Sequence, residues 1–139
     1  MNYGHAIDPD RRFIFQVYEG HFSLEQVIAC TQRLWADPAY CKSYHGIIDI
    51  SRMCVSHDIA QVRTYISFLQ QDPHTSNVRW ATITSSPWLT ACAMIYRTAM
   101  AERHPIEVFS TWSAATDYLH LNLPSPPAVS YFTDLPGNP

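Results

Sequence analysis

The segment from Tyr44 to Ser51 constrains the fold of this chain more than any other part of its sequence. An apolar run that starts at Gly46 ends at Asp49-Ile50-Ser51, and a helical pattern opens a few residues later. A buried parallel strand has this pattern when it delivers polar groups to the edge of a sheet. The segment therefore predicts an α/β fold and marks the sheet edge where a site is expected.

Strand and helix patterns alternate along the rest of the chain. Two strands joined by the turn residues Asp8-Pro9-Asp10 are expected first, over residues 3–7 and 12–18. The further strands are expected at 46–51, 78–84 and 106–109, and the helices start at Ser23, at Ser56 or Asp58, at Ser86, and at Ser110 or Thr111. The order β-β-α-β-α-β-α-β-α predicts a mainly parallel five-stranded sheet with an N-terminal antiparallel hairpin and four helices.

Proline marks the end of three of these helices. Asp37-Pro38, Asp72-Pro73 and His104-Pro105 stop the first, second and third helix, because the residue before a proline avoids the helical region. The third helix is therefore expected to run to about residue 103, and the fourth to about residue 122.

The chain of 139 residues is long enough for one ordinary domain, expected over residues 1–123. Residues 124–139 differ, because five of the ten prolines lie there. This segment also contains Tyr131, Phe132 and Leu135, so we expect an extended arm that packs on its own domain or on a neighbouring copy.

Charge excludes several classes of partner. The net charge is -3 and the nine Lys and Arg residues form no run, which argues against nucleic-acid binding and against a basic membrane patch. No apolar run reaches a membrane-spanning length, and residues 1–10 lack the apolar core of a signal peptide, so a cytoplasmic protein is expected. Charged residues make up only 15% of the chain, which favours a homodimer that covers part of the surface.

Familiar cofactor and catalytic motifs are absent from the sequence. Four glycines cannot supply a dinucleotide-binding or P-loop fingerprint, and no G-x-S-x-G motif occurs. None of the four cysteines forms a C-x-x-C pair, and the seven histidines form no H-x-H or H-E-x-x-H motif. We therefore expect no metal and no cofactor.

Four stretches of the chain share their order with a known fold. They are Phe15–Gly20, Gly46–Ser51, Arg79–Thr84, and Val108-Phe109 followed by Ala114–Leu119. Together they resemble the SpoIIAA-like group of the STAS superfamily over about residues 3–121, with kinship in shape to CRAL-TRIO lipid-binding domains. The resemblance implies a binding or regulatory module that acts through protein partners or a small lipophilic ligand.

The chain departs from that family at one functional position. Anti-sigma factor antagonists carry a phosphorylatable serine in a glycine-containing turn after this strand, whereas this chain has Val55-Ser56-His57-Asp58. The turn contains no glycine, and an acid stands about where the phosphoserine would be. A phosphorylation switch of the family's kind is therefore not implied.

Polar residues are expected together at the carboxyl edge of the parallel strands. Helix N-termini there offer free N–H groups for a small anion, although helix caps alone would explain the serines and are favoured. The candidate anion or ligand contacts are Ser51, Arg52, Ser56, Ser86 and Thr111. The enzyme alternative is a small hydrolase or transferase that uses Asp49 and His57 with Ser85 or Ser86.

The predicted third helix is apolar nearly all round between Pro87 and Tyr96. Its stripe toward the sheet leaves Trp88, Ala91, Met94 and Ile95 partly outside. A helix of this kind is buried on more than one side, by the proline-rich arm, by a second copy, or by an apolar ligand in a groove. The leading interpretation is a non-catalytic binding or regulatory module that acts through this helix and the adjacent sheet edge.

Overall fold

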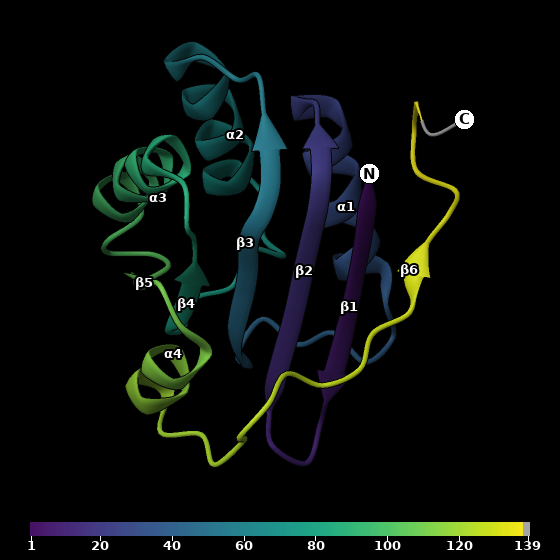
Figure 1. Ribbon diagram of the computed structural model, residues 1–139, viewed down its shortest axis with the longest axis vertical. Helices are drawn as coiled ribbons and strands as arrows, with labels where there is room; N and C mark the ends of the chain where they lie inside the picture. Colours follow the sequence, from purple (N-terminus) through teal and green to yellow (C-terminus); the bar gives the residue numbers. More distant parts are fainter. Residues whose placement is uncertain (138–139) are drawn as a thin grey trace.

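The computed structural model describes residues 1–137 and confirms the predicted α/β class (Figure 1). Residues 138–139, the end of the predicted arm, lie outside the described residues. The strands are β1 (Asn2–Asp8), β2 (Phe13–Phe22), β3 (His45–Val55), β4 (Trp80–Ile83), β5 (Ile106–Phe109) and β6 (Tyr131–Phe132). The helices are α1 (Leu24–Ala36), α2 (Ile59–Gln71), α3 (Pro87–Ala99) and α4 (Trp112–Leu119).

The sheet is mainly parallel, as predicted, and its strand order is β5-β4-β3-β2-β1-β6. Strands β2 to β5 pair in parallel, and β1 and β2 form the expected antiparallel hairpin. The short strand β6, which was not predicted, comes from the arm and pairs antiparallel with the outer edge of β1. The five predicted strands are therefore joined by a sixth.

Helix starts follow the capping residues in the sequence. Ser23 and Asp58 each form a capping box, with Gln26 and Gln61 respectively, and Asp58 rather than Ser56 caps α2. Each box satisfies backbone N–H groups that the first turn of a helix leaves unpaired. Ser86 caps α3, whose first residue is proline, and Thr111 rather than Ser110 caps α4.

The sheet separates two apolar layers. On one face, the side chains of Phe15, Ile47 and Ala81 pack with Ala115 and Leu119 of α4. On the other face, helices α1, α2 and α3 cover the sheet (Figure 1). Because successive residues of a strand point to opposite faces, the apolar runs of β2 and β3 supply both layers.

Gly46 is required by close contact between neighbouring strands. A Cβ atom at this position would lie 2.4 Å from Cε2 of Trp80, well inside van der Waals contact. Trp80 is fixed in turn, since its Nε1–H donates to Oγ of Ser76 at 2.9 Å. The glycine that opens the predicted strand therefore makes room for a buried indole ring on β4.

Strand β3 extends beyond its predicted end. It continues to Val55 beside β2, which itself continues to Phe22, and the pairing of the two strands shifts register between Val17 and Glu19. Ser51 and Arg52 consequently lie within the strand rather than at its end.

The arm packs against its own chain. Leu135 is only 4% exposed and joins a core cluster with Phe22 and Val27, and Asp134 forms an ion pair with Arg33 at 2.6 Å. The yellow arm and α3 lie on opposite sides of the molecule in Figure 1. Of the three alternatives for the outer face of α3, cover by the arm is therefore wrong, because the arm pairs with the β1 edge instead.

Candidate functional site

A cavity of about 200 Å³ lies between the sheet and helices α1, α2 and α3. Alternate residues of the strands form its floor, among them Tyr18, Ile48, Ile50, Trp80 and Ile106. Its helical wall includes Val27 and Leu34 of α1, Val62 and Ile66 of α2, and Leu89 and Ala93 of α3. The inner stripes of three amphipathic helices thus border a partly open space that they do not fill.

Most polar groups in the cavity lining are already hydrogen-bonded within the chain. Thr31 donates to the carbonyl of Val27 and lies 2.9 Å from the hydroxyl of Tyr65. Thr75 donates to the carbonyl of Leu69 at 2.6 Å. Because these groups are paired, the cavity is an apolar environment with little demand for water.

Two histidines of the lining, His57 and His104, each carry one exception. Nε2 of His57 and Nε2 of His104 are the buried side-chain nitrogen or oxygen atoms that lack a hydrogen-bond partner among residues 1–137. His104 is 8% exposed, and its Nδ1 lies 2.5 Å from the hydroxyl of Tyr96. Burial lowers the pKa of His104 from 6.5 to about 4, so its ring is neutral near pH 7.

His57 occupies the turn between β3 and α2, next to the capping residue Asp58. Its side chain is half-buried, and burial lowers the pKa of this imidazole as well. His104 lies just before β5, whose first residue pairs with Trp80 at the start of β4. The two histidines therefore lie toward opposite ends of the strands that form the cavity floor.

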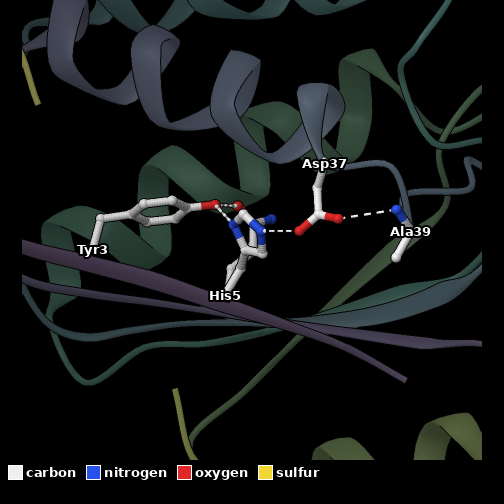
Figure 2. Close-up of polar contacts among 5 residues, drawn as sticks. Tyr3, His5, Asp37 and Ala39 are labelled. Carbon is white, nitrogen blue, oxygen red and sulfur yellow. Dashed lines mark hydrogen bonds and ion pairs between the residues drawn. The ribbon is translucent and has the colours of Figure 1, made fainter. Parts of the chain in front are cut away.

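A buried polar network lies on the same face, at the β1 end of the sheet (Figure 2). The hydroxyl of Tyr3 is 3.1 Å from Nδ1 of His5, and Nε2 of His5 is 2.9 Å from a carboxylate oxygen of Asp37. Tyr3 also donates to the side-chain carbonyl of Gln16, which belongs to the cavity lining. The network joins β1 and β2 to the carboxyl end of α1.

This network has the residue types of a proton relay but the properties of a structural element. Burial raises the pKa of Tyr3 well above its ordinary value, so the phenol keeps its proton. Although burial raises the pKa of Asp37, the backbone N–H of Ala39 and the His5 ring lower it overall. The phenol is fully buried beneath the ring of Phe132 and has no access to a substrate.

The structure places part of the predicted sheet-edge site on the opposite face. Asp49, Ser51 and Arg52 line a second pocket, of about 260 Å³, between β2, β3 and the arm. Ser51 donates to Asp49 through its hydroxyl at 2.6 Å, and Arg52 lies 3.5 Å from Glu19. Ser51 and Asp49 are therefore paired within β3, and Arg52 is paired with Glu19 on the adjacent strand β2.

Two of the remaining predicted site residues, Ser86 and Thr111, are helix caps. Ser86 and Thr111 accept the backbone N–H groups of their helices, and Ser85 donates to the carbonyl of Ser51 at 2.7 Å. Ser56 is exposed. Within residues 1–137 no hydrogen bond joins His57 to Asp49, Ser85 or Ser86, because His57 lies on the cavity side of the sheet.

The apolar residues of helix α3 lie on two sides of the helix, one facing the cavity and one facing outward. Leu89, Cys92, Ala93 and Tyr96 belong to the cavity lining. On the outer side, Trp88 is 40% exposed and Met94 is 41% exposed, and Ala91 is exposed as well. Ile95 is partly buried against a cluster that includes Val62 and Ile66 of α2. The apolar character of this helix thus serves the cavity and leaves a separate apolar outer face.

Comparisons with known proteins support the fold rather than a reaction. No protein-family model and no curated protein matches the sequence. A solved structure of an uncharacterized DUF3478 family protein with a SpoIIAA-like fold, from Shewanella loihica PV-4, superimposes with a TM-score of 0.56. The match covers 86% of this chain and 95% of that chain.

The fold is SpoIIAA-like. The sequence identity to the Shewanella loihica protein is 12%, so the similarity establishes the arrangement of elements and nothing about a shared ligand. The predicted SpoIIAA-like resemblance is confirmed at this level. Within residues 1–137, no helix of the SpoIIAA-like fold is long and apolar enough to cross a bilayer, and no three His, Cys, Asp or Glu side chains gather as a metal site.

Sequence reasoning missed the cavity and its unpartnered His104. The cavity arises where three helices meet one sheet, and no local pattern gives the volume left between them. The continuous apolar surface of α3 was the available signal, because it exceeds what one contact with the sheet requires.

Proposed function

We propose that this protein is a non-catalytic binding module whose cavity takes a small, uncharged lipophilic molecule. The observation that carries this proposal is the cavity of about 200 Å³, lined by apolar side chains of the sheet and of α1, α2 and α3. A native core is normally packed to high density, so an unfilled apolar space of this size is a feature to be explained.

The size and charge of the cavity restrict its ligand. An apolar cavity of about 150 Å³ stays dry and binds benzene, so this larger space suits a substituted ring or a short branched chain. No Lys, Arg, Asp or Glu side chain belongs to the lining. A charged ligand would lose its hydration without gaining an opposite charge, which disfavours binding.

The chemistry of the lining favours binding over catalysis. Burial raises the pKa of the Cys92 thiol and of the Tyr65 and Tyr96 phenols, so these groups stay protonated and are weak nucleophiles. The residues of the enzyme alternative, Asp49 and His57, are on opposite faces of the sheet.

Titration of the ¹⁵N-labelled protein with ethylbenzene tests the proposal. We expect saturable amide shift changes that are confined to the cavity face of the sheet and to the facing sides of α1, α2 and α3. An Ala93→Leu variant places three extra carbon atoms in the cavity and should weaken binding at least tenfold, whereas Ala91→Leu on the exposed side of α3 should leave it unchanged.

Two results would contradict the proposal. One is the absence of saturable shifts up to the solubility limit of ethylbenzene. The other is equal binding by the Ala93→Leu and Ala91→Leu variants, because it would place the ligand outside the cavity.

We also propose that the outer face of α3 pairs with a second copy of the chain. The support is the exposure of Trp88 and Met94 on a helix that has no charged residue between Pro87 and Tyr96. A symmetric dimer would bring this face onto itself and bury both side chains.

A further inference from the structure

We propose that His104 is the polar contact of the cavity, where its Nε2–H donates a hydrogen bond to an uncharged acceptor oxygen of the bound molecule. Ketones, aldehydes and esters are then preferred to hydrocarbons of the same shape. This inference rests on the proposed function and names the ligand class more narrowly.

The Tyr96 hydroxyl sets the tautomer of His104. The two groups are 2.5 Å apart, and the structure gives the Tyr96 hydroxyl no other partner among the described residues. A phenol hydrogen needs an acceptor when buried, and Nδ1 of His104 is the one within reach. Since Nδ1 then accepts, a neutral ring carries its single hydrogen on Nε2, which is the nitrogen without a partner.

Packing holds the His104 ring in place. It makes edge contacts with Trp80, at a centroid distance of 5.7 Å, and with Tyr96, at 5.8 Å. The backbone N–H of His104 donates to the carbonyl of Met100 at 2.7 Å, which fixes the turn that carries the ring. The ring is therefore held in one orientation, and binding costs little side-chain entropy. Because Nε2 is buried in the free protein, the side chains beside it must move apart for a ligand oxygen to reach it.

An unpartnered buried donor also penalises the wrong ligand. A buried N–H without an acceptor is energetically unfavourable, and a hydrocarbon in the cavity leaves that penalty in place. A ligand oxygen that accepts from Nε2 removes it. The other unpartnered imidazole, His57, is half-buried in a turn, so we assign the contact to His104, which is 8% exposed.

The experiment compares acetophenone with ethylbenzene, which have nearly the same shape and differ by one carbonyl oxygen. The measured quantity is the ratio of their dissociation constants, taken for the wild type and for a His104→Phe variant. Comparing this ratio between proteins cancels the different hydration of the two ligands. We expect the preference for acetophenone to fall about tenfold in His104→Phe, from the cost of an unpaired donor.

A His57→Phe variant is the matched control, because it removes the other unpartnered imidazole. Its ratio should equal that of the wild type. If His104→Phe leaves the ratio unchanged while both ligands still bind, this inference is wrong and the proposed function stands. If neither ligand binds the wild type, the proposed function fails and this inference fails with it.

A second readout needs no variant and covers the case in which His104→Phe does not fold. In protein with ¹⁵N-labelled histidine, acetophenone should shift the Nε2–H resonance of His104 downfield, and ethylbenzene should not. An Nε2 without a bound hydrogen, or equal shifts with both ligands, would overturn the assignment.

Discussion

The imidazole of His104 links the stability of this protein to pH. Its pKa is about 4 in the folded chain against 6.5 for an ordinary histidine. Between these values the unfolded chain binds the proton and the folded chain does not, so the folded state loses stability as the pH falls from 6.5 to about 4. The expected loss is on the order of 3 kcal/mol, and it levels off below the folded pKa.

Urea unfolding at several pH values checks this prediction. The slope of unfolding free energy against pH should be clearly smaller for His104→Phe than for the wild type. A residual slope is expected, because burial also lowers the pKa of His57. Identical slopes for both proteins would mean that His104 is not buried as a neutral ring.

Gly46 gives a second prediction for a single residue. A Gly46→Ala substitution pushes a methyl group into the ring of Trp80 and should destabilise the protein by about 1–3 kcal/mol. A Trp80→Phe change shortens the ring and relieves part of that clash, so the double variant should lose less stability than the sum of the single variants. Thermal unfolding of the four proteins tests this; strict additivity would exclude the contact.

The elements show what the sequence could predict and what it could not. Caps such as Ser23 and Thr111 and stops such as Asp37-Pro38 act within one turn, so local pattern predicted the four helices and their starts. Two ends were predicted too late: α3 ends at Ala99 rather than near residue 103, and α4 ends at Leu119 rather than near residue 122. The extension of β3 to Val55 depends on pairing with β2, a contact between distant segments, and it was missed.

The candidate site was harder to predict than the elements, because it too depends on contacts between segments that are distant in the sequence. Sequence reasoning placed Asp49 and His57 at one edge because both follow an apolar strand. Side chains alternate between the two faces along a strand. Between the pairs Val17–Asp49 and Glu19–Arg52, β3 has one residue more than β2, and this register shift interrupts the alternation in β3. Asp49 and His57 therefore lie on opposite faces of the sheet. His104 was interpreted as the end of a helix, and its partner Tyr96 lies eight residues earlier.

The arm makes a prediction at the level of a whole element. Leu135 packs in the core with Phe22, so Leu135→Ala should destabilise the protein by about 2–4 kcal/mol. Asp134→Asn is the control, because the ion pair with Arg33 involves an exposed carboxylate and should contribute less than about 1 kcal/mol. Equal small effects in urea unfolding would show that the arm does not fold with the domain.

At the scale of the whole molecule, the proposed dimer depends on the outer face of α3. Met94 is 41% exposed, and Met94→Glu would place a charge in the centre of that face. We expect sedimentation to show a dimer for the wild type and a monomer for Met94→Glu, since an unpaired charge in an apolar interface is costly. A Gln32→Glu change on the exposed surface of α1, away from α3, serves as a control for charge alone. An unchanged dimer in Met94→Glu would exclude α3 as the interface.

The pairing of β6 with β1 has a consequence for the behaviour of the protein at high concentration. An open strand edge presents unpaired N–H and C=O groups that recruit strands from other molecules. The arm occupies part of the long edge of β1 with its own backbone, and the opposite edge strand, β5, has only four residues. A proline-rich segment that composition alone would assign to a disordered tail thus protects the sheet from edge-to-edge aggregation.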